Sequence, residues 1–235
     1  MRDLEKAMLE EEFYLKDKFN GKATSLQARL EQYGYSTLQE YFTDKQQYLF
    51  NQWKPEVYFF PIDEFAEKVE SAINNAEYGI YIPVSNGVHA YHGTDEIDYE
   101  QCAQEGIHVI ELNYMGGTII GTEEDFSIEI IAPANIGVDF NCIINKFYEI
   151  ISKYEENVAI DGNDILINGN KVLGSMTRRI GNIFVWAAQT SFSDHIEIIN
   201  KICKKKSHKA PGYISNKELT KEKLQTEVIS WLQKL

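Results

Sequence analysis

Residues 161–175, DGNDILINGNKVLGS, are the most informative stretch of this sequence. Asp164 begins a short apolar strand, and Asn168-Gly169 has the composition of a two-residue hairpin turn. Lys171 begins the return strand, and Gly174 marks a point at which another group approaches the backbone closely. The stretch therefore predicts a β-hairpin that holds a carboxylate, on Asp164, and an ammonium group, on Lys171, on one rigid element.

Such a pair suits the activation of a carboxylic acid by a nucleotide. The carboxylate can hold a magnesium ion against the phosphates, while the lysine sits between the acid and the α-phosphate as negative charge builds there. Taken alone, the same spacing also fits a surface hairpin with an incidental lysine and an aspartate that caps its turn. The spacing leaves both interpretations open.

Short β-rich runs surround this hairpin and alternate with amphipathic helices. Strands are predicted at residues 78–84, 88–91, 107–112, 118–121, 126–132, 164–167, 171–175 and 183–190. Helices are predicted at 97–105, 139–154 and 217–234, after a cap at Ser193 or Asp194, and after a cap at Asp63 with Phe65, Val69 and Ile73 buried. The tight hairpins predict an α+β (mixed α/β) fold, a largely antiparallel sheet flanked by helices. No dinucleotide or P-loop glycine motif is present in the sequence.

The first quarter of the chain has a different character from the rest. Its apolar spacing predicts helices, and a capping-box pattern precedes the last of them. We therefore expect a helical N-terminal extension at residues 1–54 and a separate domain at residues 55–235.

Composition limits the classes of function. A net charge of −13 disfavours general nucleic-acid binding, and no apolar run is long enough to cross a membrane. The N-terminus lacks a signal-peptide pattern, so we expect a cytoplasmic protein with its three cysteines reduced. The basic run at 201–209 fits either a solvated helix end or a local contact with phosphate or an acidic partner.

The lysine hairpin resembles a motif of lipoate and biotin protein ligases. Residues 161–175 are similar to the GNDI...GxKxxGS signature of that family, in which the lysine is the residue most tied to catalysis. The order of elements from about residue 78 to 200 is similar too. The resemblance implies a divergent relative of lipoate-protein ligase A, with a catalytic domain of the class II synthetase-like type.

The resemblance also implies a reaction and a set of site residues. An enzyme of this kind adenylates lipoate or a similar small acid, using ATP and Mg²⁺, and transfers the acyl group to a lysine of a lipoyl-type carrier domain. Lys171 would be catalytic and Asp164 would support the metal. The hairpin at 161–175 and the glycine loop at 114–118 would bind substrate and nucleotide. The residues concerned are Gly116, Gly117, Thr118, Asn163, Asp164, Gly174 and Ser175.

The sequence departs from the family pattern at one important place. Lipoate ligases usually carry two arginines before the glycine loop, where this chain has Glu111 to Tyr114. Arg178 and Arg179 follow the lysine, but strand alternation sends them to opposite faces, so at most one could help. A non-catalytic binding protein that keeps the fold is therefore an alternative.

Other side chains carry weaker signals. A cysteine-dependent acyltransferase is a second alternative, with Cys142 as the best-placed thiol, although a buried or inert thiol is the simpler interpretation of each cysteine. His89 and His92 would lie on opposite faces of a strand, which disfavours a metal site, and surface or turn positions are expected for the histidines. Ser193, Asp194 and His195 are too close in sequence to form a catalytic triad.

Overall fold

The computed structural model divides the chain into two units, Met1–Tyr48 and Leu49–Leu235. It describes residues 55–92, 97–112, 114, 118–133, 140–181, 183–204 and 209–234, all in the second unit. The predicted helices of residues 1–54 and the boundary after residue 54 lie outside the described residues. They stay predictions.

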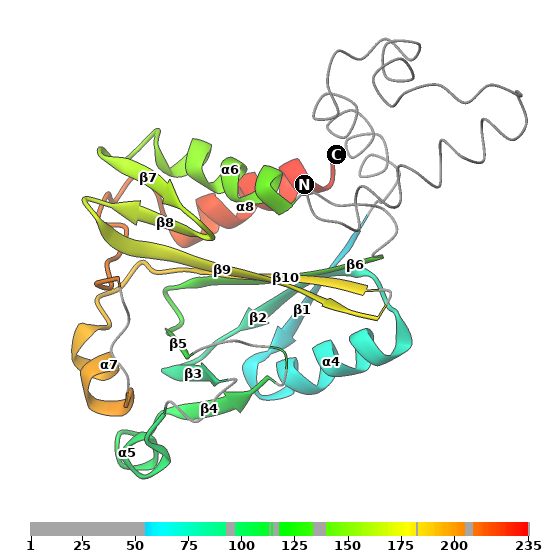
Figure 1. The fold of residues 1–235 in the computed structure, drawn as a ribbon, viewed down its shortest axis with the longest axis horizontal. Coiled ribbons are helices and arrows are strands. Elements are labelled where there is room, and N and C mark those ends of the chain that lie inside the picture. Colours follow the sequence, from blue (N-terminus) through cyan, green and yellow to red (C-terminus); the bar gives the residue numbers. More distant parts are fainter. Residues whose placement is uncertain are drawn as a thin grey trace, which may run out of the picture. The chain divides into compact units, whose positions relative to one another are not determined.

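A seven-stranded sheet forms the centre of the second unit (Figure 1), with the strand order β1-β2-β6-β10-β9-β8-β7. All neighbours in it are antiparallel except β1 and β2, which are parallel. The strands are β1 Glu56–Pro61, β2 Gly79–Val84, β6 Phe126–Pro133, β7 Val158–Asp161, β8 Asp164–Ile167, β9 Asn170–Ile180 and β10 Ile183–Thr190. The fold is thus α+β with a largely antiparallel sheet, as the sequence predicts.

A second, three-stranded sheet has the order β4-β3-β5. Its central strand pairs in parallel with β4 and antiparallel with β5. The strands are β3 His89–His92, β4 His108–Glu111 and β5 Ile119–Gly121. In Figure 1 this sheet and α4 lie on one side of the large sheet, while α6 and α8 lie on the other.

Helices α4, α6 and α8 cover the large sheet with apolar faces, while α5 and α7 pack in a separate cluster with the small sheet. Their bounds are α4 Ile62–Asn75, α5 Tyr99–Gln104, α6 Phe140–Ile151, α7 Ile196–Ile202 and α8 Lys221–Leu232. In α4, the predicted buried positions Phe65, Val69 and Ile73 are 1, 0 and 9% exposed. The 3.6-residue apolar spacing therefore identified the buried face correctly.

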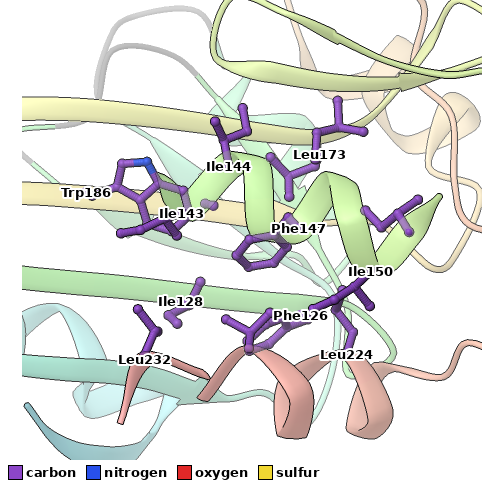
Figure 2. Close-up of a cluster of buried hydrophobic side chains, with 14 of the residues drawn as sticks. Phe126, Ile128, Ile143, Ile144, Phe147, Ile150, Leu173, Trp186, Leu224 and Leu232 are labelled. Atoms are coloured by element: carbon purple, nitrogen blue, oxygen red, sulfur yellow. The ribbon is translucent and has the colours of Figure 1, made fainter. Parts of the chain in front are cut away.

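The largest apolar cluster fills the space between the large sheet and the pair α6 and α8. Phe147 of α6 packs against Trp186 of β10 and Phe126 of β6, and Leu224 and Leu232 of α8 close the cluster (Figure 2). All five side chains are essentially buried. This face of the sheet is a packed hydrophobic core.

Some local predictions were wrong. Asp63 does not cap α4, because the helix already begins at Ile62 and Pro61 holds the N-cap position without a side-chain bond. The cap before α7 is His195, although the carboxylate of Asp194 accepts a hydrogen bond from the amide of Ile196 at 2.9 Å. Strand β7 was not predicted, because three of its four residues are exposed and it lacks a buried apolar alternation.

Among the described helices, none combines the length and apolar character that crossing a membrane requires.

Candidate functional site

The predicted hairpin holds its carboxylate and its ammonium group together. Asn168 and Gly169 turn the chain from β8 to β9 with φ of 51° and 81°, as the primed hairpin turns require. The Nζ atom of Lys171 lies 2.9 Å from Oδ1 of Asp164. The Asp164 side chain is 15% exposed and that of Lys171 36%, so the pair is partly shielded from water yet accessible to a ligand.

Gly174 allows the lysine to lie across the strand. A Cβ atom at this position would be 2.6 Å from Cε and 2.7 Å from Nζ of Lys171. Any larger residue would push the ammonium group away from its present position. The close approach expected at Gly174 is therefore made by the side chain of Lys171 itself.

A second lysine, Lys209, completes the charged cluster. Its Nζ lies 2.7 Å from Oδ2 of Asp164 and 3.0 Å from Oδ2 of Asp161. Hydrogen bonding to Asp164, followed by that to Asp161, raises the pKa of Lys209, so its positive charge is secure at neutral pH. Asp164 thus lies between two ammonium groups, one on each carboxylate oxygen.

The backbone beyond Lys209 fixes the lysine strand. The amide of Lys171 donates to the carbonyl of Ala210 at 2.8 Å, and the amide of Gly212 donates to the carbonyl of Lys171 at 2.8 Å. Residues 209–212 therefore run beside the start of β9. They bring Lys209 to the site from the C-terminal part of the chain.

Other predicted site residues have different roles or lie outside the described residues. The amide and hydroxyl of Ser175 both donate to the carbonyl of Asn163, at 2.9 and 2.7 Å, so these two residues close the hairpin base. Thr118 precedes β5 and is half-buried. Gly116 and Gly117 lie outside the described residues, and their predicted role in ligand binding stays a prediction.

The two arginines separate as strand alternation predicts. Arg178 donates from Nη1 to the carbonyl of Tyr114 at 3.0 Å, next to the glycine loop. Arg179 donates to the carbonyl of Gly181 and lies over the ring of Phe184. Of the two arginines, Arg178 is therefore the one that bonds to Tyr114.

A row of polar residues crosses the same face of the sheet as Lys171. Register pairs place Ser127 of β6 opposite Gln189 of β10, and Gln189 opposite Gly174 of β9. Directly opposed residues share a face, so this row leads from β6 to the position over which Lys171 lies. Glu129, two residues after Ser127, points to that face as well.

Glu129 is a buried acid on this face. Its side chain accepts a hydrogen bond of 2.5 Å from the hydroxyl of Tyr114, and the residue is 5% exposed. Burial raises the pKa of Glu129 from 4.5 to about 7, against the lowering effect of the Tyr114 bond. Glu129 can therefore exchange a proton near neutral pH.

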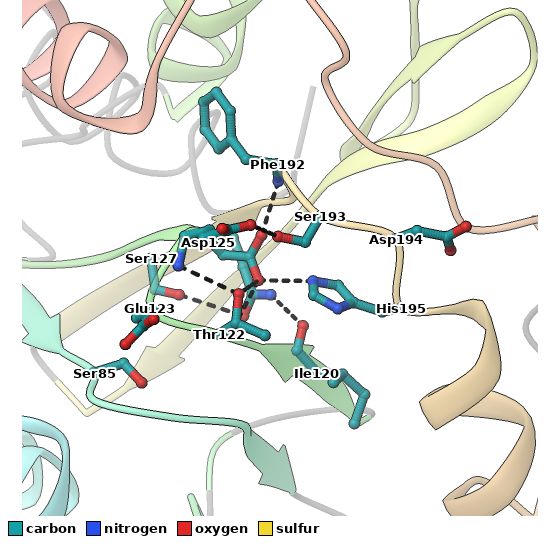
Figure 3. A network of polar contacts seen from close by, with 12 residues as sticks. Ser85, Ile120, Thr122, Glu123, Asp125, Ser127, Phe192, Ser193, Asp194 and His195 are labelled. Carbon is teal, nitrogen blue, oxygen red and sulfur yellow. Dashed lines mark hydrogen bonds and ion pairs between the residues drawn. The ribbon is translucent and has the colours of Figure 1, made fainter. Parts of the chain in front are cut away.

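Two histidines are buried, contrary to the prediction of surface positions. His195 pairs with Asp125 at 2.7 Å, and the same carboxylate accepts bonds from the amides of Thr122 and Phe192, each at 2.8 Å (Figure 3). His89 is 2% exposed, and burial lowers its pKa. The Asp125 cluster joins the turn after β5 to the segment before α7, which is a structural task.

The three cysteines are thiols and pack in apolar clusters. Cys142 packs against the core beneath α6, on the opposite face of the sheet from Lys171. Burial raises the pKa of Cys102, which makes its thiolate scarcer. The geometry gives the cysteine-dependent route no support.

The described residues do not form a metal-binding site of their own. They contain no group of three or more His, Cys, Asp or Glu side chains that could hold an ion. Both oxygens of Asp164 are in ion pairs, so a cation there would displace Lys209. The two lysines instead fit an anion such as a polyphosphate.

Comparison with solved structures finds proteins with a similar fold. The model superimposes on P. falciparum LipL1 in complex with lipoate with a TM-score of 0.61 and 17% identity, over 74% of this chain and 59% of that one. It matches lipoate-protein ligase A bound with ATP with a TM-score of 0.57 and 11% identity, over 76% of this chain and 83% of that one. It also matches a structure from work on a bipartite lipoate protein ligase and its E2 lipoyl domain from Thermoplasma acidophilum, with a TM-score of 0.59 and 10% identity, over 75% of this chain and 81% of that one.

The chain has the lipoate-protein ligase fold. No family model matches the sequence, and no curated protein matches it either. The likeness therefore lies in the arrangement of strands and helices. The chain spans about 59% of LipL1, so that protein is considerably longer.

Within this ligase fold, sequence reasoning missed three features of the site. Lys209 was part of a basic run that also fitted a solvated helix end, and nothing local linked it to Asp164. Glu129 lies in an apolar strand where a single acid gives no positional signal. Tyr114 was predicted only as the start of the glycine loop and as a replacement for the family's arginines, whereas its hydroxyl donates to Glu129 and its carbonyl accepts from Arg178.

Proposed function

We propose that this chain is a lipoate-protein ligase-like enzyme that activates a small carboxylic acid with ATP and transfers the acyl group to a lysine of a carrier domain. Lipoate is the first candidate acid, and the cytoplasm is the expected location. The observation that carries the proposal is the Lys171 ammonium group, held over Gly174 by Asp164 at 2.9 Å. The ligase fold supports it.

The chemistry requires a cation between two anions. In the first step a carboxylate oxygen of the acid attacks the α-phosphorus of ATP, and pyrophosphate leaves. In the second step the amine of the carrier lysine attacks the acyl carbon, AMP leaves, and an amide forms. The Lys171 ammonium would lie between carboxylate and α-phosphate, where it offsets their repulsion and stabilises the developing charge.

The neighbouring groups would support Lys171 in defined ways. Asp164 orients its ammonium group, and Lys209 adds a second positive charge for the phosphates. Arg178 lies at the base of the glycine loop, where it would partly replace the arginines that the family usually carries. Asp164 would hold the magnesium ion that comes with ATP once Lys209 turns from Asp164 towards the phosphates.

A non-catalytic binding protein is the second candidate. The observation in its favour is Tyr114, which fills the position before the glycine loop with a buried phenol bonded to Glu129. That arrangement supplies no side-chain cation at a place where ligases carry two. Such a protein would bind the acid or a carrier domain without forming an adenylate.

The decisive experiment is acid-dependent exchange of radiolabelled pyrophosphate into ATP, with lipoate, octanoate and biotin tested in turn. We expect exchange with at least one acid and a loss of about 100-fold or more in Lys171→Ala, since one electrostatic group of this kind contributes about 10²–10³. Lys153→Ala removes an exposed lysine paired with Glu227 and serves as the matched control. Equal exchange in the two variants would exclude this mechanism.

Binding of an acid by titration, without any exchange, would support the binding-protein alternative. If exchange is observed, adding a lipoyl domain tests the transfer of the acyl group to the carrier lysine. Amide formation on that lysine is detected as an increase in the mass of the lipoyl domain.

A further inference from the structure

A buried tyrosine, Tyr114, bridges two strands of the large sheet that are not neighbours. Its hydroxyl donates to Glu129 of β6 at 2.5 Å, and its carbonyl accepts from Nη1 of Arg178 of β9 at 3.0 Å. Strand β10 lies between β6 and β9 in the sheet. The side chain and the backbone of Tyr114 are therefore bonded to different strands, which fixes the residue at both ends.

The register of the strands explains how one residue spans this distance. Glu129 lies opposite Ala187 of β10, and Ala187 lies opposite Met176, two residues before Arg178 on β9. Directly opposed residues, and residues two apart on one strand, share a face of the sheet. Tyr114 and Ala187 pack in the same buried cluster. Glu129, Tyr114 and Arg178 thus form a line across one face, over a strand whose side chain there is small.

The bond between Tyr114 and Glu129 persists whatever the charge of the acid. Burial, and then the negative charge of Glu129, raises the pKa of Tyr114 well above its usual value, so the phenol keeps its proton and stays a donor. A carboxyl group can accept from a hydroxyl in its ionised and in its protonated form. The two residues are 4 and 5% exposed, so the bond is also shielded from competing water.

The line ends on a cation at the surface. Arg178 is exposed, whereas Tyr114 and Glu129 are buried. A guanidinium group carries five N–H donors in one rigid plane, so a bond that holds Nη1 also sets the direction of the other donors. The carbonyl of Tyr114 therefore orients the charged end of Arg178, and Glu129 orients Tyr114.

Arg178 lies on the same face of β9 as the ammonium group of Lys171. Nζ of Lys171 lies over Gly174, and Gly174 and Arg178 are four residues apart, roughly 13 Å along one face of the strand. If the α-phosphate of ATP lies at Lys171, the β- and γ-phosphates can extend along β9 towards Arg178. Guanidinium groups bind phosphate oxygens in a two-pronged geometry, which suits such a contact.

We propose that Tyr114 and Glu129 are positioning residues, which hold the Arg178 guanidinium in place to bind the β- and γ-phosphates of ATP. The inference rests on the proposed function, because it takes the α-phosphate to lie at Lys171. Glu129 and Tyr114 do not touch the nucleotide in this arrangement. They act through Arg178.

A comparison of ATP with AMP tests this directly, because AMP lacks the two phosphates that Arg178 would bind. Each nucleotide is titrated into the full chain with magnesium and without an acid, so no reaction consumes it. Arg178→Ala should weaken ATP binding about tenfold or more, as expected for a lost charge-assisted bond, and AMP binding less than about twofold. Tyr114→Phe, which loses the bond to Glu129, should weaken ATP binding about three- to tenfold and spare AMP.

A double-mutant cycle shows whether Tyr114 acts through Arg178. In the Arg178→Ala background, Tyr114→Phe should cause no further loss of ATP affinity, whereas independent effects would add. Glu129→Gln keeps an acceptor for the Tyr114 hydroxyl and should retain ATP affinity within about twofold. Urea midpoints of all variants establish that each one is folded.

Matched controls remove the same groups elsewhere. Arg179→Ala deletes the neighbouring arginine, which bonds to the carbonyl of Gly181. Tyr99→Phe deletes a hydroxyl that donates to Glu111 at 3.0 Å on the surface. Both variants should bind ATP as the native chain does.

The outcomes separate this inference from the proposed function. Equal binding of ATP and AMP by the native chain, no binding of ATP, equal weakening of both nucleotides in Tyr114→Phe, or additive losses in the cycle would overturn the inference. If an acid supports pyrophosphate exchange and the KM for ATP is unchanged in Tyr114→Phe and Arg178→Ala, the ligase proposal stands and the inference fails. If the losses are specific to ATP and coupled but no acid supports exchange, the positioning role stands and the ligase proposal fails.

Discussion

The two faces of the large sheet differ sharply in chemistry. The face beneath α6 and α8 is packed with apolar side chains, with Phe147, Trp186 and Leu224 almost fully buried (Figure 2). The opposite face carries a second apolar cluster beneath α4, and in addition Glu129 and the row of polar residues that leads to the Lys171 pair. The polar residues of the candidate site thus lie on one face of the sheet only, because alternate residues of each strand point to opposite faces.

The comparison teaches where changes should affect stability and where they should affect binding. Substitutions on the apolar face should lower the free energy of unfolding and leave the site geometry alone while the protein is folded. Substitutions of the site residues on the opposite face should alter ligand binding or catalysis at little cost in stability. Each of the following variants tests one side of this division.

Phe147→Ala should have the largest effect on stability. Removing a fully buried aromatic ring that packs against Trp186 and Phe126 costs about 3–5 kcal/mol in the free energy of unfolding. Urea denaturation followed by tryptophan fluorescence measures it. Phe59→Ala, a change at a phenylalanine that is 52% exposed, is the control and should stay within about 0.5 kcal/mol. Similar losses in both variants would contradict the assignment of the core.

Glu129→Gln should change how stability depends on pH. In the unfolded chain this carboxyl ionises near pH 4.5, whereas in the fold its pKa is about 7. Between these values the unfolded state releases its proton first, so the free energy of unfolding of the native protein should fall as pH rises and level off above pH 7. The full loss is on the order of 3 kcal/mol.

The Glu129→Gln variant lacks this titration and should be flatter across the window. Urea midpoints at pH 5 and pH 8, for both proteins, measure the difference. An identical pH dependence in the two proteins would show that Glu129 ionises normally. It would also show that burial does not raise the pKa of Glu129.

Gly174→Ala should reduce activity while the fold persists. The added methyl group would lie 2.6 Å from Cε of Lys171, and the flexible side chain would move aside. Misplacement of about 1 Å can cost around 100-fold, so we expect pyrophosphate exchange to fall about 10- to 100-fold. Gly87→Ala, where nothing lies within 4 Å of the added atom, is the matched control. Full activity in Gly174→Ala would mean that Lys171 need not lie across the strand.

Lys209→Ala should have the smallest effect. The lysine is 27% exposed in its pairs with Asp161 and Asp164, so its removal should change stability by less than about 1 kcal/mol. ATP affinity, measured by titration, should fall severalfold at low salt and less at high salt, because charge is screened. Lys201→Ala, which breaks an exposed pair with Glu105, should leave ATP affinity unchanged. Equal affinities would remove Lys209 from the site.

The local features of this fold were the ones that the sequence predicted well. Asn168-Gly169 specifies its turn by backbone preference alone, and the apolar spacing of α4 specifies its buried face. Strand β7, Val158–Asp161, was not predicted because it is mostly exposed and its formation depends on pairing with β8. The parallel pairing of β1 with β2 is set by the return of α4 and not by either strand.

The site was predictable only as far as it is local. Asp164 and Lys171 belong to one hairpin, so their spacing brought them together. Lys209 and Glu129 join them through long-range packing, and no periodicity reports such contacts. The prediction of a surface position for His195 was wrong for the same reason. Its partner Asp125, which makes its burial possible, is far away in sequence.

The pairing of residues 209–212 with the start of β9 also sets an order of events during synthesis. A ribosome makes the hairpin of Asp164 and Lys171 well before it makes Ala210 and Gly212, whose backbone groups bond to Lys171. A nascent chain that ends between these segments has the lysine without its backbone partners. The complete charged cluster therefore arises only after residues 209–212 have emerged, well after the hairpin itself, so the cluster forms late in the folding of this domain.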